Sequence, residues 1–265
     1  MTHEHRDLPL APGSQAGPGL FLSFEGGDGV GKTTQIHRLS GLLEAAGVDC
    51  LVTREPGGTE LGAEIRRLLL HGGEVSARAA ALLYAADRAH HVQTRVRPAL
   101  ARGGVVITDR YLDSSVAYQG AARSLGSQEV RDLSLWATQG LLPDLTILLD
   151  AEPGIAARRA GERAALDRLE REPSSFHVAL REEFLALAAA EPGRFVVIDA
   201  DRGVEEVAEQ VTAAVVRLIR SRTESPGGHV PQADASHSQV PHPTGGAWAA
   251  LSAFAATYGG REVGR

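Results

Sequence analysis

The stretch LFLSFEGGDGVGKTT at residues 20–34 decides the fold of this 265-residue chain. Its first six residues are mostly apolar, which is typical of a strand that a sheet buries on both faces. Gly26, Gly31, Lys32 and Thr33 follow in the pattern G-x-x-x-x-G-K-[ST], and a helical pattern comes after them. Such a glycine-rich turn points backbone N–H groups at a phosphate, and the next helix adds the positive end of its dipole. The sequence therefore predicts a phosphate-binding loop, the P-loop.

A P-loop predicts a nucleoside triphosphate as ligand. We expect its phosphates to contact Gly26, Gly27, Asp28, Gly29, Val30, Gly31, Lys32, Thr33 and Thr34. Lys32 is expected to reach the β- and γ-phosphates, and the Thr33 hydroxyl to ligate Mg²⁺. A second element, VVITDR at residues 105–110, is an apolar strand that ends in Asp109. Because a carboxylate in this position can hold the same ion, Thr33 and Asp109 form the predicted metal site.

The rest of the chain alternates short apolar runs with longer helical patterns, which predicts an α/β fold with a parallel sheet covered on both faces. The expected strands are Leu20–Glu25, Asp49–Thr53, Val105–Thr108, Leu145–Leu149 and Phe195–Ile198. The expected helices lie near residues 32–47, 60–71, 77–101, 127–140, 153–190 and 203–220. These elements predict one domain over residues 19–220.

The two ends of the chain differ from this domain in composition. Residues 1–18 are rich in Pro, Gly and polar residues, so we expect a disordered leader. Residues 221–265 begin with a Pro-, Gly-, Ser- and His-rich stretch and continue with AWAALSAFAATYGG, a short helix-forming segment rich in small residues. Here we expect a disordered or loosely ordered tail, with a segment that docks on a partner as the alternative.

Charge and cysteine usage narrow the class of protein. A net charge of −6 argues against a nucleic-acid-binding protein, which usually has a basic surplus. Cys50 is the only cysteine, so an intrachain disulfide is impossible and a thiolate zinc site is not expected. The sequence shows neither a signal peptide nor an apolar run of about 20 residues that would span a bilayer. We expect a cytoplasmic protein with no membrane or nucleic-acid partner.

Among P-loop proteins, the sequence favours a small kinase. A GTP-dependent switch would carry an N-K-x-D motif, which is missing, and a motor or large ATPase would be longer. The motifs EGGDGVGKTTQ, REPGGT (Arg54–Thr59), LLYAADR (Leu82–Arg88) and DRYLDSSVAYQG (Asp109–Gly120) stand in the order and spacing of thymidylate kinases. The resemblance covers residues 20–220 and continues through PDLTILLD and LDR at Leu166–Arg168.

This resemblance implies transfer of the γ-phosphoryl of ATP to dTMP, giving dTDP and ADP for dTTP synthesis, with Mg²⁺. It also implies a three-layer P-loop kinase fold with a five-stranded parallel sheet and a mobile lid, and a homodimer. Two alternatives stay open. One is a kinase for another nucleotide or small metabolite, and the other is a nucleotide-binding protein without catalysis.

The resemblance also assigns residues to the acceptor. It places Asp28 near the 3′-hydroxyl of dTMP, Arg54 and Arg110 around its phosphate, and Tyr84 in stacking contact with thymine. Guanidinium groups bind phosphate oxygens bidentately, so two of them would position dTMP. Arg88 lies one helical turn after Tyr84 and is expected to read a carbonyl edge of the base. The remaining acceptor residues that the resemblance implies are Ser114, Ser115, Tyr118 against C2′ of the sugar, and Gln119.

The lid is expected to supply the arginines that stabilise charge on the transferred phosphoryl group. Some thymidylate kinases have an arginine in the P-loop, but here positions 27–30 contain no basic residue, so the chain resembles the type with arginines in the lid. The sequence RRAGERAALDR offers Arg158, Arg159, Arg163 and Arg168, of which we expect Arg163 first and Arg159 second to act in catalysis. Gly161 and Glu162 depart from the more basic pattern of related lids.

Two smaller expectations concern a proline and a pair of histidines. The resemblance implies a cis peptide bond between Glu55 and Pro56, which X–Pro bonds permit. His90 and His91 are adjacent on a predicted helix and face different directions, so we assign them no chemistry.

Overall fold

The computed structural model describes residues 19–121, 125–156, 172–224 and 246–259. Its centre is a five-stranded sheet in the order β2-β3-β1-β4-β5, with every pair of neighbouring strands parallel. The strands are β1 (Leu20–Glu25), β2 (Cys50–Arg54), β3 (Val105–Asp109), β4 (Leu145–Asp150) and β5 (Phe195–Asp199). The predicted α/β fold is confirmed, and all five predicted strands are present.

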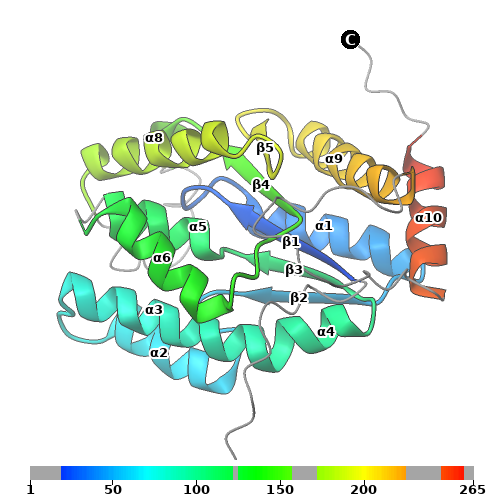
Figure 1. Cartoon of the computed structure of the whole chain (residues 1–265). Coiled ribbons are helices and arrows are strands. Elements are labelled where there is room, and N and C mark those ends of the chain that lie inside the picture. The colour runs from blue at the N-terminus through cyan, green and yellow to red at the C-terminus, as the bar shows by residue number, and fades with distance from the viewer. Residues whose placement is uncertain (1–18, 122–124, 157–171, 225–245, 260–265) are drawn as a thin grey trace, which may run out of the picture.

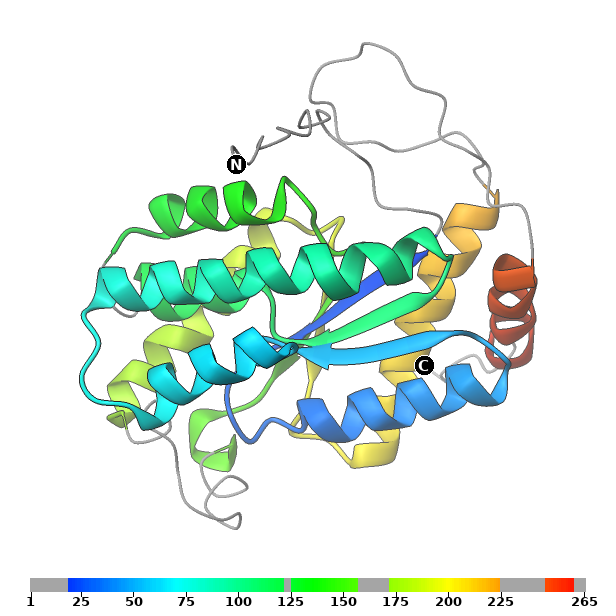
Figure 2. The same cartoon turned by 90° about the horizontal axis from the view of Figure 1, so that it is seen from below.

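Helices cover both faces of the sheet and make three layers (Figures 1 and 2). The α-helices are α1 (Lys32–Ala45), α2 (Glu60–His71), α3 (Ala77–His91), α4 (Arg97–Ala101), α5 (Leu112–Ser115), α6 (Ser127–Thr138), α8 (Ser174–Ala190), α9 (Val204–Glu224) and α10 (Gly246–Tyr258). Two π-helical segments, η1 (Val92–Val96) and η2 (Val116–Ala121), join α3 to α4 and extend α5.

The side chains of each strand point alternately to the two helical layers. Leu22 and Phe24 of β1 belong to a core cluster with residues of α1, α9 and α10. Phe21, which precedes Leu22 and points the opposite way, packs on the other face against η1, α4 and Tyr111. This second face also includes α8, whose Phe184 packs in a cluster with Leu148 of β4. Burial on both faces explains the continuous apolar runs in the sequence.

The parallel arrangement brings the carboxyl ends of all strands to one edge of the sheet. The strands end in Glu25, Arg54, Asp109, Asp150 and Asp199, in that order along the chain. In the register of the sheet, Asp109 stands beside both Phe24 and Arg54. In open α/β sheets ligands bind at this edge, and the P-loop leaves β1 here.

Two helical predictions need correction. The segment of residues 112–121 has no predicted helix, but it forms α5 and η2, which pack against α6. Leu112 and Val116 of this segment also belong to the core cluster that contains Val106 of β3. A single helix over residues 153–190 is also wrong, because α8 begins only at Ser174. Pro173 precedes it in an extended conformation (φ −65°, ψ 157°), and a proline has no N–H with which to continue a helix from the preceding turn. Residues 157–171 lie outside the described residues.

The C-terminal part of the chain also departs from the expected tail. Helix α9 continues to Glu224, past the predicted domain boundary at residue 220, and α10 follows at Gly246–Tyr258. Leu251 and Phe254 of α10 are fully buried in the core cluster that α1 and α9 share. Figure 1 shows α10 packed beside α9, at the side of the molecule away from α8. No helix among the described residues has the length and apolar character needed to cross a membrane.

Candidate active site

The P-loop connects β1 to α1, and its glycines have conformations that other residues rarely adopt. Gly26 has φ 126°, and a Cβ there would lie 2.4 Å from the carbonyl oxygen of Leu149. Gly31 has φ 98° and is the N-cap of α1. Positive φ values and close backbone approach both favour glycine. The loop therefore presents its backbone at the N-terminus of α1, as the motif predicts.

Lys32 is the first residue of α1 and is buried. Its ammonium donates hydrogen bonds to the carbonyl oxygens of Gly26 (3.0 Å) and Gly27 (2.6 Å). Burial lowers the pKa of Lys32, and the nearby Arg110 lowers it further, whereas Asp109 and Asp28 act in the opposite direction. The side chain thus folds over the loop whose phosphate ligand it is expected to bind.

Thr33 and Asp109 meet at the edge of the sheet, as predicted. The Thr33 Oγ1 is 3.5 Å from Asp109 Oδ2. The other carboxylate oxygen, Oδ1, is buried and has no hydrogen-bond partner among the described residues. A buried carboxylate oxygen without a partner is costly, so it is suited to a ligand that supplies positive charge. Among the described residues, no group of three or more His, Cys, Asp and Glu side chains forms a metal site.

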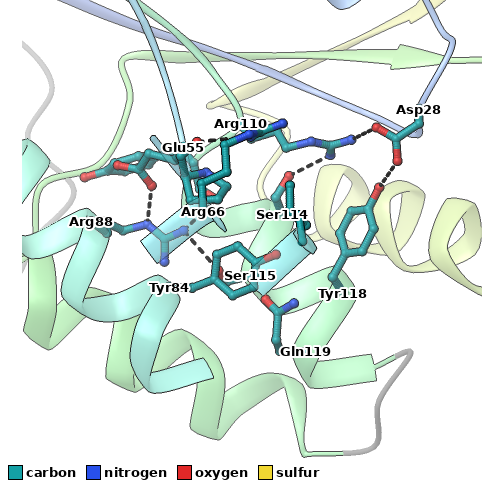
Figure 3. A pocket seen from close by; sticks show the side chains of 13 residues that line it. Asp28, Glu55, Arg66, Tyr84, Arg88, Arg110, Ser114, Ser115, Tyr118 and Gln119 are labelled. Carbon is teal, nitrogen blue, oxygen red and sulfur yellow. Dashed lines mark hydrogen bonds and ion pairs between the residues drawn. The ribbon is translucent and has the colours of Figure 1, made fainter. Parts of the chain in front are cut away.

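A pocket lies next to the P-loop, between α2, α3 and the segment from Asp109 to η2 (Figure 3). It brings together eight residues that the resemblance assigned to the site: Asp28, Tyr84, Arg88, Arg110, Ser114, Ser115, Tyr118 and Gln119. Five further residues line it: Glu55, Pro56, Arg66, Leu70 and Tyr111. Arg54 is exposed at the end of β2 and does not line this pocket, so its role stays a prediction.

Arg110 joins the P-loop to the pocket. Its Nη1 donates to Gly26 O (3.0 Å) and to Ser114 Oγ (3.1 Å), and its Nη2 donates to Asp28 Oδ1 (2.5 Å). Its guanidinium also lies over the ring of Tyr118, 5.0 Å from the centroid. The Tyr118 hydroxyl donates to Asp28 Oδ2 (3.1 Å). Burial acts to raise the pKa of Asp28, but Arg110 and Lys32 hold it well below its usual range.

Arg88 is buried, with only 2% of its surface exposed. Its Nε donates to Glu55 Oε2 (2.7 Å), and its Nη1 donates to Ser134 Oγ (3.1 Å). Its Nη2 donates to the Tyr111 carbonyl (3.1 Å) and to Ser115 Oγ (2.9 Å). A guanidinium has five N–H groups, so one Nη1 hydrogen is left without a partner among the described residues. The protein thus fixes this side chain rigidly at the pocket wall.

A buried polar network, which the sequence interpretation missed, supports Arg88. The second oxygen of Glu55 accepts from His91 Nδ1 (2.8 Å), and His91 Nε2 is 2.7 Å from Thr53 Oγ1. Asp87 is also buried here, and burial together with the charge of Glu55 raises its pKa to about 6. The positions of Asp87, Arg88 and His91 along α3 give the signal, because residues three and four apart share a helix face.

Four of the five additional pocket residues follow signals in the sequence. Glu55 and Pro56 belong to the REPGGT motif, and the peptide bond between them is cis, as expected. Arg66 and Leu70 are four residues apart on α2 and therefore face the pocket together. The Arg66 Nη1 donates to the carbonyl of Pro56 (3.1 Å). The lid arginines Arg158, Arg159, Arg163 and Arg168 lie outside the described residues.

Comparison with known proteins agrees with this geometry. The family model for thymidylate kinase matches residues 24–211, well over half of the chain. Thymidylate kinase from Leifsonia xyli is 62% identical over 196 residues, which cover 73% of this chain and 93% of the relative. The corresponding enzyme from Clavibacter michiganensis is 59% identical over 203 residues (76% and 96%), and that from Deinococcus radiodurans is 48% identical over 198 residues (74% and 96%). The chain therefore belongs to the thymidylate kinase family.

Proposed function

We propose that this chain transfers the γ-phosphoryl group of ATP to dTMP, giving dTDP and ADP. The observation that supports this most directly is the double contact of Arg110, which binds both Gly26 of the P-loop and Asp28 at the pocket. A phosphate in the pocket would therefore lie next to the phosphates on the loop. Holding two reactants in this way can remove several kcal/mol from the barrier.

In the pocket, two guanidiniums are available for the acceptor phosphate. Arg110 and Arg66 both line the cavity, and arginine forks suit phosphate oxygens. Figure 3 shows Arg110 and Asp28 at one end of the pocket, with Tyr84 and Gln119 away from them. We propose that thymine lies against Tyr84, near Gln119 and the remaining N–H of Arg88, and that the sugar lies near Tyr118 and Asp28.

On the donor side, the P-loop N–H groups, the start of α1 and Lys32 would bind the ATP phosphates. We propose that Thr33 and Asp109 hold Mg²⁺, because the Asp109 Oδ1 is buried without a partner among the described residues. When bound, the ion would neutralise charge on the phosphates. Additional positive charge from Arg163 and Arg159 of the lid stays a prediction.

The proposed step is a direct in-line transfer. A phosphate oxygen of dTMP forms the new bond to the γ-phosphorus while the bond to the β-γ bridging oxygen of ATP breaks, and ADP leaves with that electron pair. The acceptor is already an anion, so no strong general base is needed. Asp28 fits this requirement, because its depressed pKa makes it a hydrogen-bond acceptor and a weak base. Positioning and electrostatic stabilisation by Lys32, Arg110 and the loop would lower the barrier.

The acceptor profile tests this proposal. With ATP as donor, we expect kcat/KM for dTMP to exceed that for dCMP and dGMP at least about 100-fold, because the fixed polar groups of Arg88 and Gln119 would be mispaired. Against dUMP, which lacks one methyl group, we expect about tenfold. A coupled assay of ADP release measures all four. Equal rates would instead favour a kinase for another acceptor, and no ADP release with any acceptor would favour a non-catalytic protein.

We also propose a homodimer that forms through α3 and its neighbours α2 and α6. These helices expose large apolar side chains, including Leu82 of α3 (59% exposed) and Trp136 of α6 (80% exposed). Leu61 and Leu68 of α2 are exposed too. Apolar side chains gathered on one part of a surface indicate an interaction site. A cytoplasmic location and the absence of a nucleic-acid partner stay predictions from the sequence.

We expect the substitution Trp136→Glu to convert the dimer to a monomer, because an aromatic anchor at an interface often contributes 2 kcal/mol or more. Mass measurement by light scattering at micromolar concentration checks this. The matched control is Val178→Glu on α8, an exposed apolar residue on another helix, which should leave the mass unchanged. A monomeric wild-type chain, or a W136E variant that remains dimeric, would contradict the proposed interface.

A further inference from the structure

Glu25 is a buried carboxylate for which the proposed reaction has no use. It is the last residue of β1, directly before Gly26 of the P-loop, and it is fully buried. It does not line the acceptor pocket. Both of its oxygens are nevertheless occupied: Oε1 accepts from the backbone N–H of Tyr111 (2.7 Å) and Oε2 from the Ser114 hydroxyl (2.5 Å).

Both of these partners help to fix the conformation of Arg110. Arg110 has φ 70°, a left-handed conformation that is uncommon for a residue with a side chain. Its own N–H donates to Phe24 O (2.9 Å), and its carbonyl accepts from Thr108 Oγ1 (2.9 Å). The next N–H, that of Tyr111, donates to Glu25. Hydrogen bonds thus fix the backbone before and after Arg110, and Glu25 accepts the one that follows it.

The hydroxyl of Ser114 links Glu25 to the guanidinium of Arg110. An ionised carboxylate can only accept hydrogen bonds, and a guanidinium can only donate them. Ser114 therefore donates its hydrogen to Glu25 and accepts from Arg110 Nη1 (3.1 Å). The direction of these two hydrogen bonds depends on the negative charge of Glu25. Because Ser114 donates its hydrogen to Glu25, it has none left to donate to the base, although the sequence interpretation places Ser114 near the base.

The surroundings of Glu25 are unfavourable for a charge. Burial raises the pKa of Glu25 to about 7, and the nearby Asp113 contributes in the same direction. Asp113 itself is paired with Arg194, whose Nη1 and Nη2 lie 2.7 and 2.9 Å from its two oxygens. A buried carboxylate in this setting does not maximise stability, because burying a charge is costly even when it is hydrogen-bonded. Its contacts with the Arg110 segment provide another reason for its presence.

We infer that Glu25 is a positioning residue that acts through Ser114 and the Tyr111 peptide to aim the guanidinium of Arg110 at the acceptor phosphate. Glu25 itself contacts no substrate. The inference rests on the proposed role of Arg110 in binding that phosphate. Figure 3 shows how this series of hydrogen bonds continues, from Ser114 to Arg110, from Arg110 to Asp28 and from Asp28 to Tyr118.

The substitution Glu25→Gln separates this role from a purely structural one. Glutamine keeps an oxygen for the Tyr111 N–H but presents an amide NH₂ to Ser114. Ser114 must then accept from this amide and loses its fixed acceptor geometry toward Arg110. At pH 8, we expect KM for dTMP to rise about tenfold, the effect of losing one charge-assisted hydrogen bond. KM for ATP should stay within about twofold of the wild-type value.

Ser114→Ala provides a second variant that leaves the buried carboxylate in place. We expect a similar rise in KM for dTMP, and the double variant E25Q/S114A should be no worse than S114A alone, because both changes break the same link. Independent effects that multiply in the double variant would overturn the inference, as would an unchanged KM for dTMP in both single variants. Arg110→Lys separates the role of Glu25 from the proposed role of Arg110. If it raises KM for dTMP while E25Q and S114A do not, only the role of Glu25 fails, and if it has no effect, the proposed role of Arg110 fails as well.

Discussion

Replacing Lys32 with alanine is expected to lower kcat at least about 1,000-fold while the chain stays folded. Charge develops on the transferred phosphoryl group in the transition state, and removing one preorganised cationic donor typically costs 100- to 1,000-fold or more. In this chain the P-loop has no arginine to replace it, since positions 27–30 contain no basic residue. The ammonium of Lys32 is therefore the only side-chain cation within the loop motif.

The fold should tolerate this change, because the hydrogen bonds of Lys32 are to loop carbonyls. Gly26 O would keep a second donor, Arg110 Nη1 at 3.0 Å. A kcat measurement and a thermal melt check both parts. Arg38→Ala is the matched control on the same helix, because its partner Glu205 is an exposed residue of α9 and lies outside the pocket. If K32A retained wild-type kcat, or if R38A lost activity equally, the catalytic role of the P-loop lysine would be wrong.

The strands and the P-loop could be predicted from the sequence because local patterns determine them. Strands buried on both faces are continuous apolar runs, and β1 and β3 each end in a charged residue. The G-x-x-x-x-G-K-[ST] spacing is set by backbone geometry around one phosphate. Both signals lie within a few residues of one another, so they do not depend on packing elsewhere.

The polar supports of the site could not be predicted in this way. Glu25 meets Ser114 only because β1 and β3 are neighbours in the sheet and the chain turns back after Arg110. Glu55 meets Arg88 only because β2 ends beside α3. The Glu25–Ser114 pair is separated by 89 residues and the Glu55–Arg88 pair by 33, and nothing in the local sequence shows which partner each carboxylate takes.

Helix α10 illustrates the same limit at the C-terminus. Its sequence is rich in alanine, which favours a helix, but an isolated helix of 13 residues is only marginally stable in water. Its order comes from packing, because Leu251 and Phe254 are buried against the core that α1 and α9 share. Burying a large apolar side chain contributes about 1.5–3 kcal/mol, which exceeds the differences in helix propensity between residues. A prediction from the composition of residues 221–265 could not show that Leu251 and Phe254 are buried against this core.

Replacing Arg88 with methionine is expected to destabilise the fold by about 3–5 kcal/mol, because it leaves the buried carboxylate of Glu55 without its cation. The Arg88 Nε–Glu55 Oε2 distance is 2.7 Å, and both side chains are almost completely buried. Burial lowers the pKa of Arg88 and Glu55 raises it, with a net rise, so the guanidinium is charged in the wild type. For a chain of this size the loss corresponds to a fall in Tm of about 10 °C.

A pair of comparisons isolates the cause of this effect. Arg67→Met removes an exposed partner of Glu64 on α2 and should cost no more than about 0.5 kcal/mol, because exposed ion pairs contribute little. The double variant R88M/E55Q removes both charges and should recover part of the stability lost in R88M, since no unpaired carboxylate is left. KM for dTMP should be raised in R88M and equally in R88M/E55Q, because the N–H that Arg88 presents to the pocket is missing in both variants. If R88M were as stable as R67M, the buried pair would not support the pocket wall. If R88M/E55Q bound dTMP with the wild-type KM, Arg88 would not read the base.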